Sequence, residues 1–123
     1  MNGIPISIFG NGSQTRDFIH VNDVSNSIIE SLDSSLPPFS VFNLGTGKGI
    51  SIIQLLSFLE QIFIEKGFKK GEVEFHPPRE GEIIHSIAEI GGLDAIIDSS
   101  TFLPLEDGLI SLVEQAIFES RES

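Results

Sequence analysis

The sequence is most informative at Ile8-Phe9-Gly10-Asn11-Gly12-Ser13-Gln14-Thr15-Arg16-Asp17-Phe18-Ile19-His20-Val21-Asn22-Asp23-Val24. Alternation over residues 6–8 predicts a strand that runs into a glycine turn, and the apolar run 18–21 predicts a second short strand. Asn22 is a candidate N-cap for a following helix, whose apolar residues share one face up to Leu32. The order strand, turn, strand, helix indicates a mixed α/β chain.

The middle of the chain contains the clearest helix signal. Residues 41–44 are a brief, mostly apolar run of the kind found in buried strands. Ser51 and Gln54 match the capping-box pattern, and apolar residues at helical spacing follow them. Gly67 is a natural C-terminal stop for this helix.

Three further elements are predicted towards the C-terminus. Residues 73–75 alternate as a strand does, residues 87–97 predict a weak helix, and residues 105–116 predict an amphipathic helix. We therefore expect an α/β fold with short strands and three to four helices. So few strands would leave a sheet edge unpaired, which suggests that partner structure is missing.

Composition excludes several classes of function. The 123 residues are enough for one compact domain, and the net charge of −11 argues against nucleic-acid binding. Without cysteine the chain has no disulfide and no thiolate chemistry. We see no membrane-spanning run and no signal peptide, and therefore expect a cytoplasmic protein. The three histidines do not occur at metal-ligand spacing, and no pair of carboxylates indicates an acid/base site.

With so few cations, each arginine is a candidate anion ligand. Arg16 follows the first glycine turn and could donate two N–H groups to a phosphate. The alternative, favoured by spacing alone, is an ion pair of Arg16 with Asp17 or Asp23 that braces the turn. Arg79 lies in a second stiff loop, residues 76–82, which could equally be a plain surface loop.

A third candidate is the glycine turn Gly45-Thr46-Gly47-Lys48-Gly49, which leads into the capped helix. Such a turn can hold an anion at a helix N-terminus. However, its spacing matches neither the G-x-G-x-x-G fingerprint nor a P-loop. We therefore interpret it mainly as a tight packing turn.

Four segments together resemble the extended short-chain dehydrogenases/reductases, and UDP-glucose 4-epimerase in particular. Residues 8–24 resemble the family's I-F-G-D-G-x-Q-x-R-D-F-x-x-V-x-D-V, and residues 41–55 resemble F-N-x-G-T-G-x-x-x-S-x-x-x-L. Residues 78–88 resemble P-x-R-x-G-D-x-x-x-S-x-A, and residues 103–109 resemble the family's final P-x-x-x-L-x-E-G-L-like element. The segments occur in family order and span nearly the whole chain.

The resemblance implies a fold and a set of substrate contacts. The fold would be a partial Rossmann-type fold, with residues 1–123 forming a single C-terminal region that binds a nucleotide sugar such as a UDP-hexose. Arg16 and Arg79 would hold the diphosphate, Ser7 and Phe9 would lie near the uracil, and Glu82 would lie near sugar or ribose hydroxyls.

Several positions depart from the family pattern. Glu82 replaces the usual Asp and reaches one methylene further, and Asn11 replaces another common Asp. Glu89, Gly91 and Gly92 stand where the family typically has A-D-x-S-K. These changes affect the expected sugar specificity rather than the family assignment.

The catalytic half of the family pattern is not found in this chain. The family binds NAD at an N-terminal G-x-x-G-x-x-G turn and uses a Tyr-x-x-x-Lys pair, whereas this chain contains no tyrosine. We therefore expect no NAD-binding Rossmann domain, no catalytic residue, no bound NAD and no activity of this chain alone. The alternatives are a non-catalytic module that binds nucleotide sugars or pairs with a separate N-terminal NAD-binding half, and an interaction remnant without a ligand.

Overall fold

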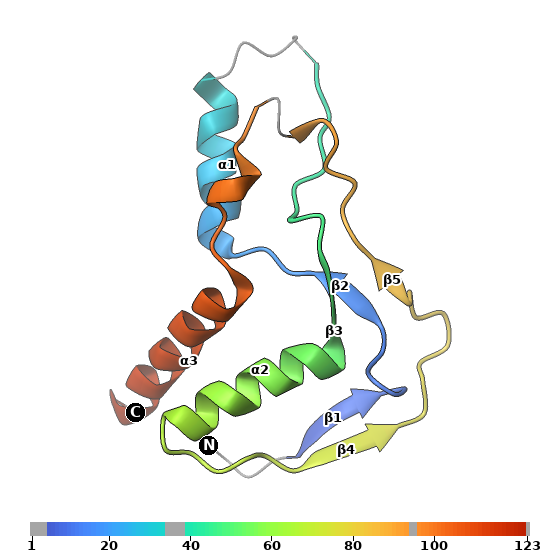
Figure 1. The fold of residues 1–123 in the computed structure, drawn as a ribbon, viewed down its shortest axis with the longest axis vertical. Coiled ribbons are helices and arrows are strands. Elements are labelled where there is room, and N and C mark those ends of the chain that lie inside the picture. The colour runs from blue at the N-terminus through green and yellow to red at the C-terminus, as the bar shows by residue number, and fades with distance from the viewer. Residues whose placement is uncertain (1–4, 34–38, 94–95, 123) are drawn as a thin grey trace.

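Two small sheets and three α-helices make up the described parts of the computed structural model, residues 5–33, 39–93 and 96–122 (Figure 1). The strands are β1 (Ile6–Phe9), β2 (Thr15–Asp17), β3 (Gly49–Ser51), β4 (Val73–His76) and β5 (His85–Ser86). The helices are α1 (Val21–Asp33), α2 (Ile52–Glu65) and α3 (Leu105–Glu122), with a short 3₁₀ turn, η2, at Ser99–Thr101. The expected α/β fold with short strands is confirmed.

The first sheet brings together the loops that follow β1 and β4. β1 and β4 run parallel, with Phe9 opposite His76, and the Gly10 N–H donates to the His76 carbonyl at 2.9 Å. Parallel pairing brings the carboxyl ends of both strands to the same edge. The loops that follow them, residues 10–14 and 77–82, therefore start side by side.

The second sheet has β2 at its centre. β3 pairs with it antiparallel and β5 pairs with it parallel, so that Arg16 lies opposite Ile50 on one side and Ser86 on the other. Three chain segments that are far apart in sequence thus meet at a strand of three residues.

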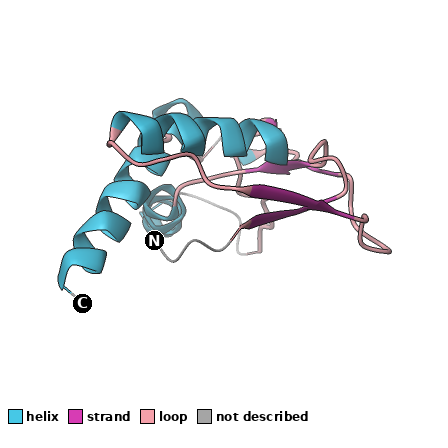
Figure 2. Cartoon of the chain, turned by 90° about the horizontal axis from the view of Figure 1, so that it is seen from below, coloured by secondary structure: helices cyan, strands magenta, loops and turns pink. Residues whose placement is uncertain are grey.

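The apolar core of the described residues lies between α2 and α3. Ile62, Leu109 and Val113 are buried there, and Phe58 and Leu59 pack against them. Figure 2 shows the strands on one side of the molecule and the C-terminal end of α3 on the other side. None of the described helices is long and apolar enough to cross a membrane.

Helix α2 confirms the local signals for its start and stop. The Gln54 N–H donates to the Ser51 hydroxyl at 3.2 Å, and the Ser51 N–H donates to the Gln54 side chain at 3.0 Å. Gly67 follows the last turn with φ +83°, a conformation that glycine adopts without steric cost.

The prediction for residues 18–21 was wrong, because the strand is β2 at 15–17 and α1 begins at Val21. Asn22 does not cap α1. The His20 carbonyl accepts the first helical bond from the Val24 N–H, and His20 Nδ1 accepts the Asn22 N–H at 3.2 Å. The imidazole of His20 therefore takes the capping role that an Asn side chain would have.

Two other predicted elements do not form. Residues 41–44 are not a strand, because the pairing positions beside β2 are taken by β3 and β5. The described residues of 87–97 contain no α-helix, in keeping with the Gly91–Gly92 pair inside that range.

A single carboxylate ties the second sheet to its surroundings. Asp17 accepts hydrogen bonds from the N–H and hydroxyl of Thr46, from the Gly47 N–H at 2.9 Å and from the Ala88 N–H at 3.2 Å. Burial by itself raises the pKa of Asp17, but the bonds from Thr46, Ala88 and Gly47 outweigh it and lower the pKa below its usual value.

We predict that Asp17→Asn destabilises the fold by about 1–3 kcal/mol near neutral pH, because the new NH₂ group faces N–H donors that lose their acceptor. Since the folded pKa of Asp17 is lowered, the ionised carboxylate stabilises the fold fully above the unfolded value of about 3.9. This stabilisation is lost as pH falls through the folded pKa. Urea denaturation of both proteins across acidic to neutral pH measures the difference.

The matched control is Glu30→Gln, which removes the same charge from an exposed side chain of α1. We expect this variant to unfold like the wild type at every pH. A difference between wild type and Asp17→Asn that stays constant down to strongly acidic pH would contradict the assigned role of the ionised Asp17.

Candidate functional site

A cavity of about 260 Å³ opens at the carboxyl ends of β1 and β4. It is bordered by the loops that follow the two strands, and its lining combines one aromatic ring, amides, a hydroxyl and both signs of charge. The lining residues are Phe9, Gly10, Asn11, Ser13, Gln14, Pro78, Arg79, Gly81, Glu82 and Ile84. We call it the β1–β4 cavity.

Arg79 and Phe9 form one wall of the β1–β4 cavity. The Arg79 guanidinium carbon lies 3.8 Å from the centroid of the Phe9 ring, a cation–π contact. The Phe9 ring also lies next to the His76 ring, with 5.4 Å between the two centroids. The register of β1 against β4 creates this wall, because it places Phe9 opposite the residue that leads into the Pro77–Pro78 turn.

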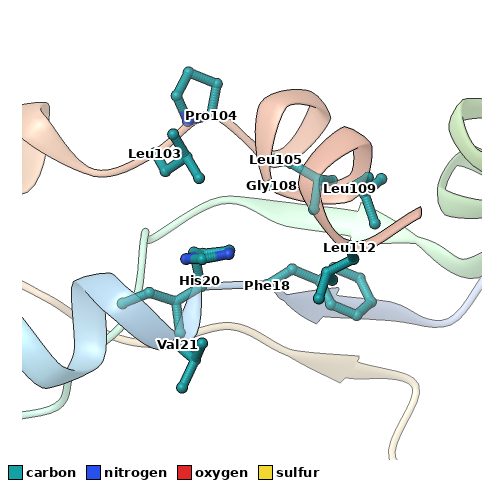
Figure 3. Close-up of a pocket in the computed structure, with 10 residues that line it drawn as sticks. Phe18, His20, Val21, Leu103, Pro104, Leu105, Gly108, Leu109 and Leu112 are labelled. Atoms are coloured by element: carbon teal, nitrogen blue, oxygen red, sulfur yellow. The ribbon is translucent and has the colours of Figure 1, made fainter. Parts of the chain in front are cut away.

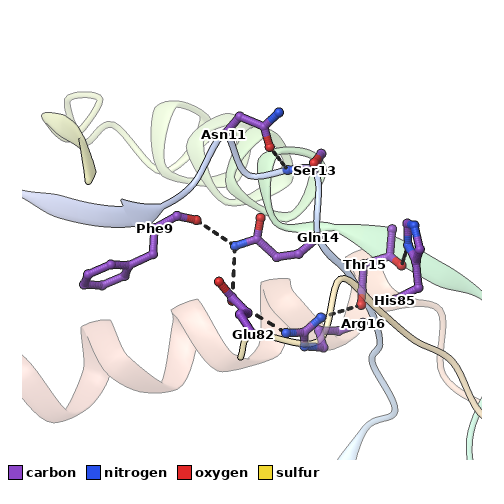
Figure 4. Close-up of polar contacts among 8 residues, drawn as sticks. All are labelled: Phe9, Asn11, Ser13, Gln14, Thr15, Arg16, Glu82 and His85. Atoms are coloured by element: carbon purple, nitrogen blue, oxygen red, sulfur yellow. Dashed lines mark hydrogen bonds and ion pairs between the residues drawn. The ribbon is translucent and has the colours of Figure 1, made fainter. Parts of the chain in front are cut away.

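Gln14 and Glu82, which also line the cavity, belong to a polar network that extends to Arg16 (Figure 4). Gln14 Nε2 donates to the Phe9 carbonyl at 2.9 Å and to Glu82 Oε1 at 3.4 Å. The same Glu82 oxygen lies 3.6 Å from Arg16 Nη2, while Arg16 Nη1 donates to the Thr15 carbonyl at 2.8 Å. Gln14, Glu82 and Arg16 are thus one connected group.

The five predicted binding residues do not all meet. Phe9, Arg79 and Glu82 line the β1–β4 cavity, and Arg16 adjoins it through its contact with Glu82. Ser7 is exposed on β1, two residues before Phe9, and does not line the cavity. Ser7 and Phe9 do share one face of the strand, as alternation requires.

The alternative ion pairs of Arg16 with Asp17 or Asp23 are not formed. Successive side chains of a strand point to opposite faces, so Asp17 turns towards Thr46 while Arg16 turns towards Glu82. Asp23 instead accepts the Leu103 N–H at 3.0 Å. Residue spacing gives no sign of Glu82 as the partner, because Arg16 and Glu82 are 66 positions apart.

Sequence reasoning also missed Gln14. Its signal was available in the strand periodicity, since Gln14 and Arg16 are two residues apart and so fall on the same side of the chain at β2. Asn11 and Ser13 were likewise missed. The Ser13 N–H donates to the Asn11 side chain at 3.0 Å, which shapes the turn at the rim of the β1–β4 cavity.

The glycine turn at residues 45–49 is filled by its own neighbours. The N–H groups of Thr46 and Gly47 donate to Asp17, so they are not offered to an external anion. A Cβ on Gly45 would lie 2.5 Å from Ala88 Cβ and 2.7 Å from Asp17 Oδ2. This supports the interpretation as a packing turn, and the turn does not fit the pyrophosphate of a dinucleotide.

A second, apolar pocket of about 280 Å³ lies where α3 begins (Figure 3). It is bordered by the loop between β2 and α1 and by the first turns of α3. Its lining residues are Phe18, Ile19, His20, Val21, Leu103, Pro104, Leu105, Gly108, Leu109 and Leu112. His20 already uses Nδ1 to cap α1, so the pocket offers little polar chemistry. No group of three or more possible metal ligands occurs among the described residues.

Comparison with known proteins relates the chain to one family. A family model described as the NAD dependent epimerase/dehydratase family matches residues 1–45. A putative UDP-glucose 4-epimerase of Methanocaldococcus jannaschii is 38% identical over 89 residues, which is 72% of this chain and 27% of that protein.

Solved structures agree with the sequence match. The UDP-N-acetylglucosamine 4-epimerase from Methanobrevibacter ruminantium, in complex with UDP-N-acetylmuramic acid, superposes with a TM-score of 0.80 at 30% identity. That match covers 96% of this chain and 36% of the other. The UDP-glucuronic acid 4-epimerase from Bacillus cereus, with UDP-glucuronic acid and NAD, superposes with a TM-score of 0.77 at 29% identity and covers 93% and 36%. The chain thus spans about a third of the length of the relatives it matches.

We predict that Gly45→Ala destabilises the fold by about 1–3 kcal/mol, because the added methyl group overlaps Ala88 and the Asp17 carboxylate. The shift of the urea midpoint measures this loss. Gly91→Ala is the matched control, since its new Cβ would meet only the end of the flexible Glu89 side chain at 3.2 Å. Equal midpoints for the two variants would show that the close approach at Gly45 does not matter.

Proposed function

Because this chain belongs to the NAD-dependent epimerase/dehydratase family, we propose that it forms the substrate-binding part of a nucleotide-sugar 4-epimerase or dehydratase. The ligand is a UDP-hexose, and its diphosphate binds between Arg79 and Arg16 at the β1–β4 cavity. One observation carries the proposal: Phe9, Arg79 and Glu82 come from segments some seventy residues apart and line a single cavity.

Each wall of the cavity suits one part of such a ligand. The exposed Arg79 guanidinium can pair with a phosphate, and a planar base can stack near the Phe9 ring. The side chains of Gln14 and Glu82 can exchange hydrogen bonds with hydroxyl groups of the ribose or the sugar. We propose Ser7 as a further contact to the base. The ground is that Ser7 lies on the same face of β1 as Phe9.

Binding of a diphosphate to this acidic chain depends strongly on a cation at the binding site itself. The chain has a net charge of −11, so its overall field repels a nucleotide diphosphate. Binding then depends on guanidinium groups close to the phosphates, where the attraction is least screened. Arg79 is such a group, because its side chain is exposed at the cavity and lies on an aromatic ring rather than on an acid.

The hydride chemistry belongs to NAD and to residues that this chain does not contain. There is no tyrosine for the family's Tyr-x-x-x-Lys pair, and the N–H of Gly47, in the glycine turn that precedes α2, already donates to Asp17. We therefore assign no catalytic residue and route no reaction step through these 123 residues. The same observations favour a second candidate function, a non-catalytic module that binds nucleotide sugars.

We further propose that the chain works together with an NAD-binding half on a separate chain or segment. Three apolar side chains of α1 support this: Ile28, Ile29 and Leu32 have exposed fractions of 56%, 60% and 79%. A parallel sheet such as β1–β4 is normally covered on both faces, yet Ile6 and Phe75 are exposed. A partner that covers these residues would remove apolar area from water.

The function predicts weak but localised binding of UDP. Titration of the isotope-labelled chain with UDP should shift NMR signals of residues 9–14 and 78–82, with a Kd on the order of 1 mM because the pocket is incomplete. Arg79→Ala should weaken binding about tenfold or more, since a charge-assisted hydrogen bond is lost.

Lys69→Ala is the control for this titration, because it removes the same charge from an exposed side chain outside the cavity. It should bind UDP nearly as the wild type does. Shifts that map away from the β1–β4 cavity, or an unchanged affinity of Arg79→Ala, would refute the diphosphate assignment.

The partner proposal predicts complementation. Co-expression with the part of the Methanocaldococcus jannaschii relative that this chain does not match should yield a complex that co-purifies with the tagged chain. Ile29→Lys should abolish co-purification, because it places a charge in the apolar α1 surface. Phe118→Lys, at a similarly exposed apolar residue of α3, should retain the complex. Equal behaviour of the two variants would argue against a partner on α1.

A further inference from the structure

The guanidinium of Arg16 is already engaged within the chain. Its Nη1 donates to the Thr15 carbonyl at 2.8 Å, and its Nη2 faces Glu82 Oε1 at 3.6 Å. A phosphate is held best by two parallel N–H groups of one guanidinium. Both terminal nitrogens of Arg16 therefore have a partner within the chain.

Glu82 lies between Arg16 and the cavity. Glu82 lines the β1–β4 cavity and Arg16 does not, although the two side chains are in contact and both are partly exposed, at 26% and 30%. A ligand that enters the cavity meets the carboxylate before it meets the guanidinium. Figure 4 shows dashed contacts from Glu82 to both Gln14 and Arg16.

Two contacts hold Glu82 in this position. The Glu82 N–H donates to the Arg79 carbonyl at 3.3 Å across Gly81, whose φ of +77° permits the tight turn. Gln14 Nε2, itself fixed by the Phe9 carbonyl, donates to Glu82 Oε1 at 3.4 Å. The same turn thus presents Arg79 and Glu82, groups of opposite charge, to one cavity.

We propose that Glu82 is an intramolecular competitor for Arg16, occupying the guanidinium that a diphosphate must take. The inference rests on the proposed function. A carboxylate and a phosphate are both anionic acceptors, so they cannot use the same Arg16 donors together without strong repulsion. A diphosphate that takes the Nη2 side of Arg16 therefore competes with the Glu82 carboxylate for that side.

Displacement of Glu82 also gives the site a preference among ligands. The released carboxylate needs new donors, and hydroxyl groups of a ribose or a hexose can supply them. Pyrophosphate has no such hydroxyls and leaves the carboxylate to water and Gln14. Glu82 thereby lowers the affinity for pyrophosphate, and it lowers the affinity for a nucleotide sugar to a smaller extent.

The size of the effect follows from the exposure of the pair. Partly exposed ion pairs contribute little, so the removal of Glu82 should raise the affinity for pyrophosphate by about twofold to fivefold. The gain for UDP-glucose should be smaller, or become a loss, because the variant also lacks the hydroxyl acceptor.

The test is an NMR titration of the 123-residue chain with pyrophosphate and with UDP-glucose, for wild type, Glu82→Gln and Glu80→Gln. Glu80 is an exposed acid on the same loop that does not line the cavity, so Glu80→Gln controls for the general loss of one negative charge. We expect a twofold to fivefold tighter pyrophosphate complex for Glu82→Gln alone. Equal gains in both variants would overturn the competition, since they would reflect long-range charge only.

A second variant links the effect to Arg16. In an Arg16→Gln background, Glu82→Gln should no longer change pyrophosphate affinity, because the guanidinium for which the carboxylate competes is gone. Arg16→Gln is isolated from the fold contacts of Asp17, which lie on the other face of β2. A persisting gain in this background would also overturn the proposal.

The outcomes separate this inference from the function on which it rests. If wild type and Glu80→Gln bind UDP-glucose and pyrophosphate in the cavity but Glu82→Gln binds pyrophosphate no better, the competition is wrong and the proposed function stands. If no variant shows cavity shifts with either ligand, the proposed function fails and this inference fails with it.

Discussion

The carboxylate of Asp17 accepts hydrogen bonds from two segments that lie far from it in the sequence, the glycine turn at Thr46 and Gly47 and the chain after β5 at Ala88. The ladders that join β2 to β3 and β5 are short. The hydrogen bonds of Asp17 therefore add needed support to the second sheet. The close approach of Gly45 to Ala88 belongs to the same constraint. Because the Asp17 side chain is held on one face of β2, the side chain of its neighbour Arg16 lies on the opposite face.

The candidate site is built on that fixed direction and on the parallel register of β1 and β4. Arg16 and Gln14 face the loop that carries Glu82, while Phe9 faces the loop that carries Arg79. The result is a cavity with Arg79 in its lining, next to the Phe9 ring, and with Arg16 beside it in contact with Glu82. In a chain of net charge −11, the proposed anion binding depends on these few local cations.

The comparisons give the chain a family, and the geometry is the basis of the role that we propose for it. Solved epimerases superpose on nearly the whole of this chain, yet the chain spans only about a third of their length. The exposed apolar residues of α1 and of the β1–β4 sheet are consistent with a fold whose remaining part lies elsewhere. The closed glycine turn and the lack of tyrosine explain why we assign substrate binding rather than chemistry to these residues.

The sequence by itself determined the features that depend on neighbouring residues: the capping box at Ser51 and Gln54, the helix over 105–116, the stop at Gly67 and the ordered family motifs. Helix signals are local because each backbone bond joins residues four positions apart. Only the tertiary structure decided which short segments became strands, because a strand exists through a partner that can lie anywhere in the chain. Residues 15–17 found two partners and residues 41–44 found none. For the same reason the contact between Arg16 and Glu82, formed across 66 positions, could not be derived from spacing.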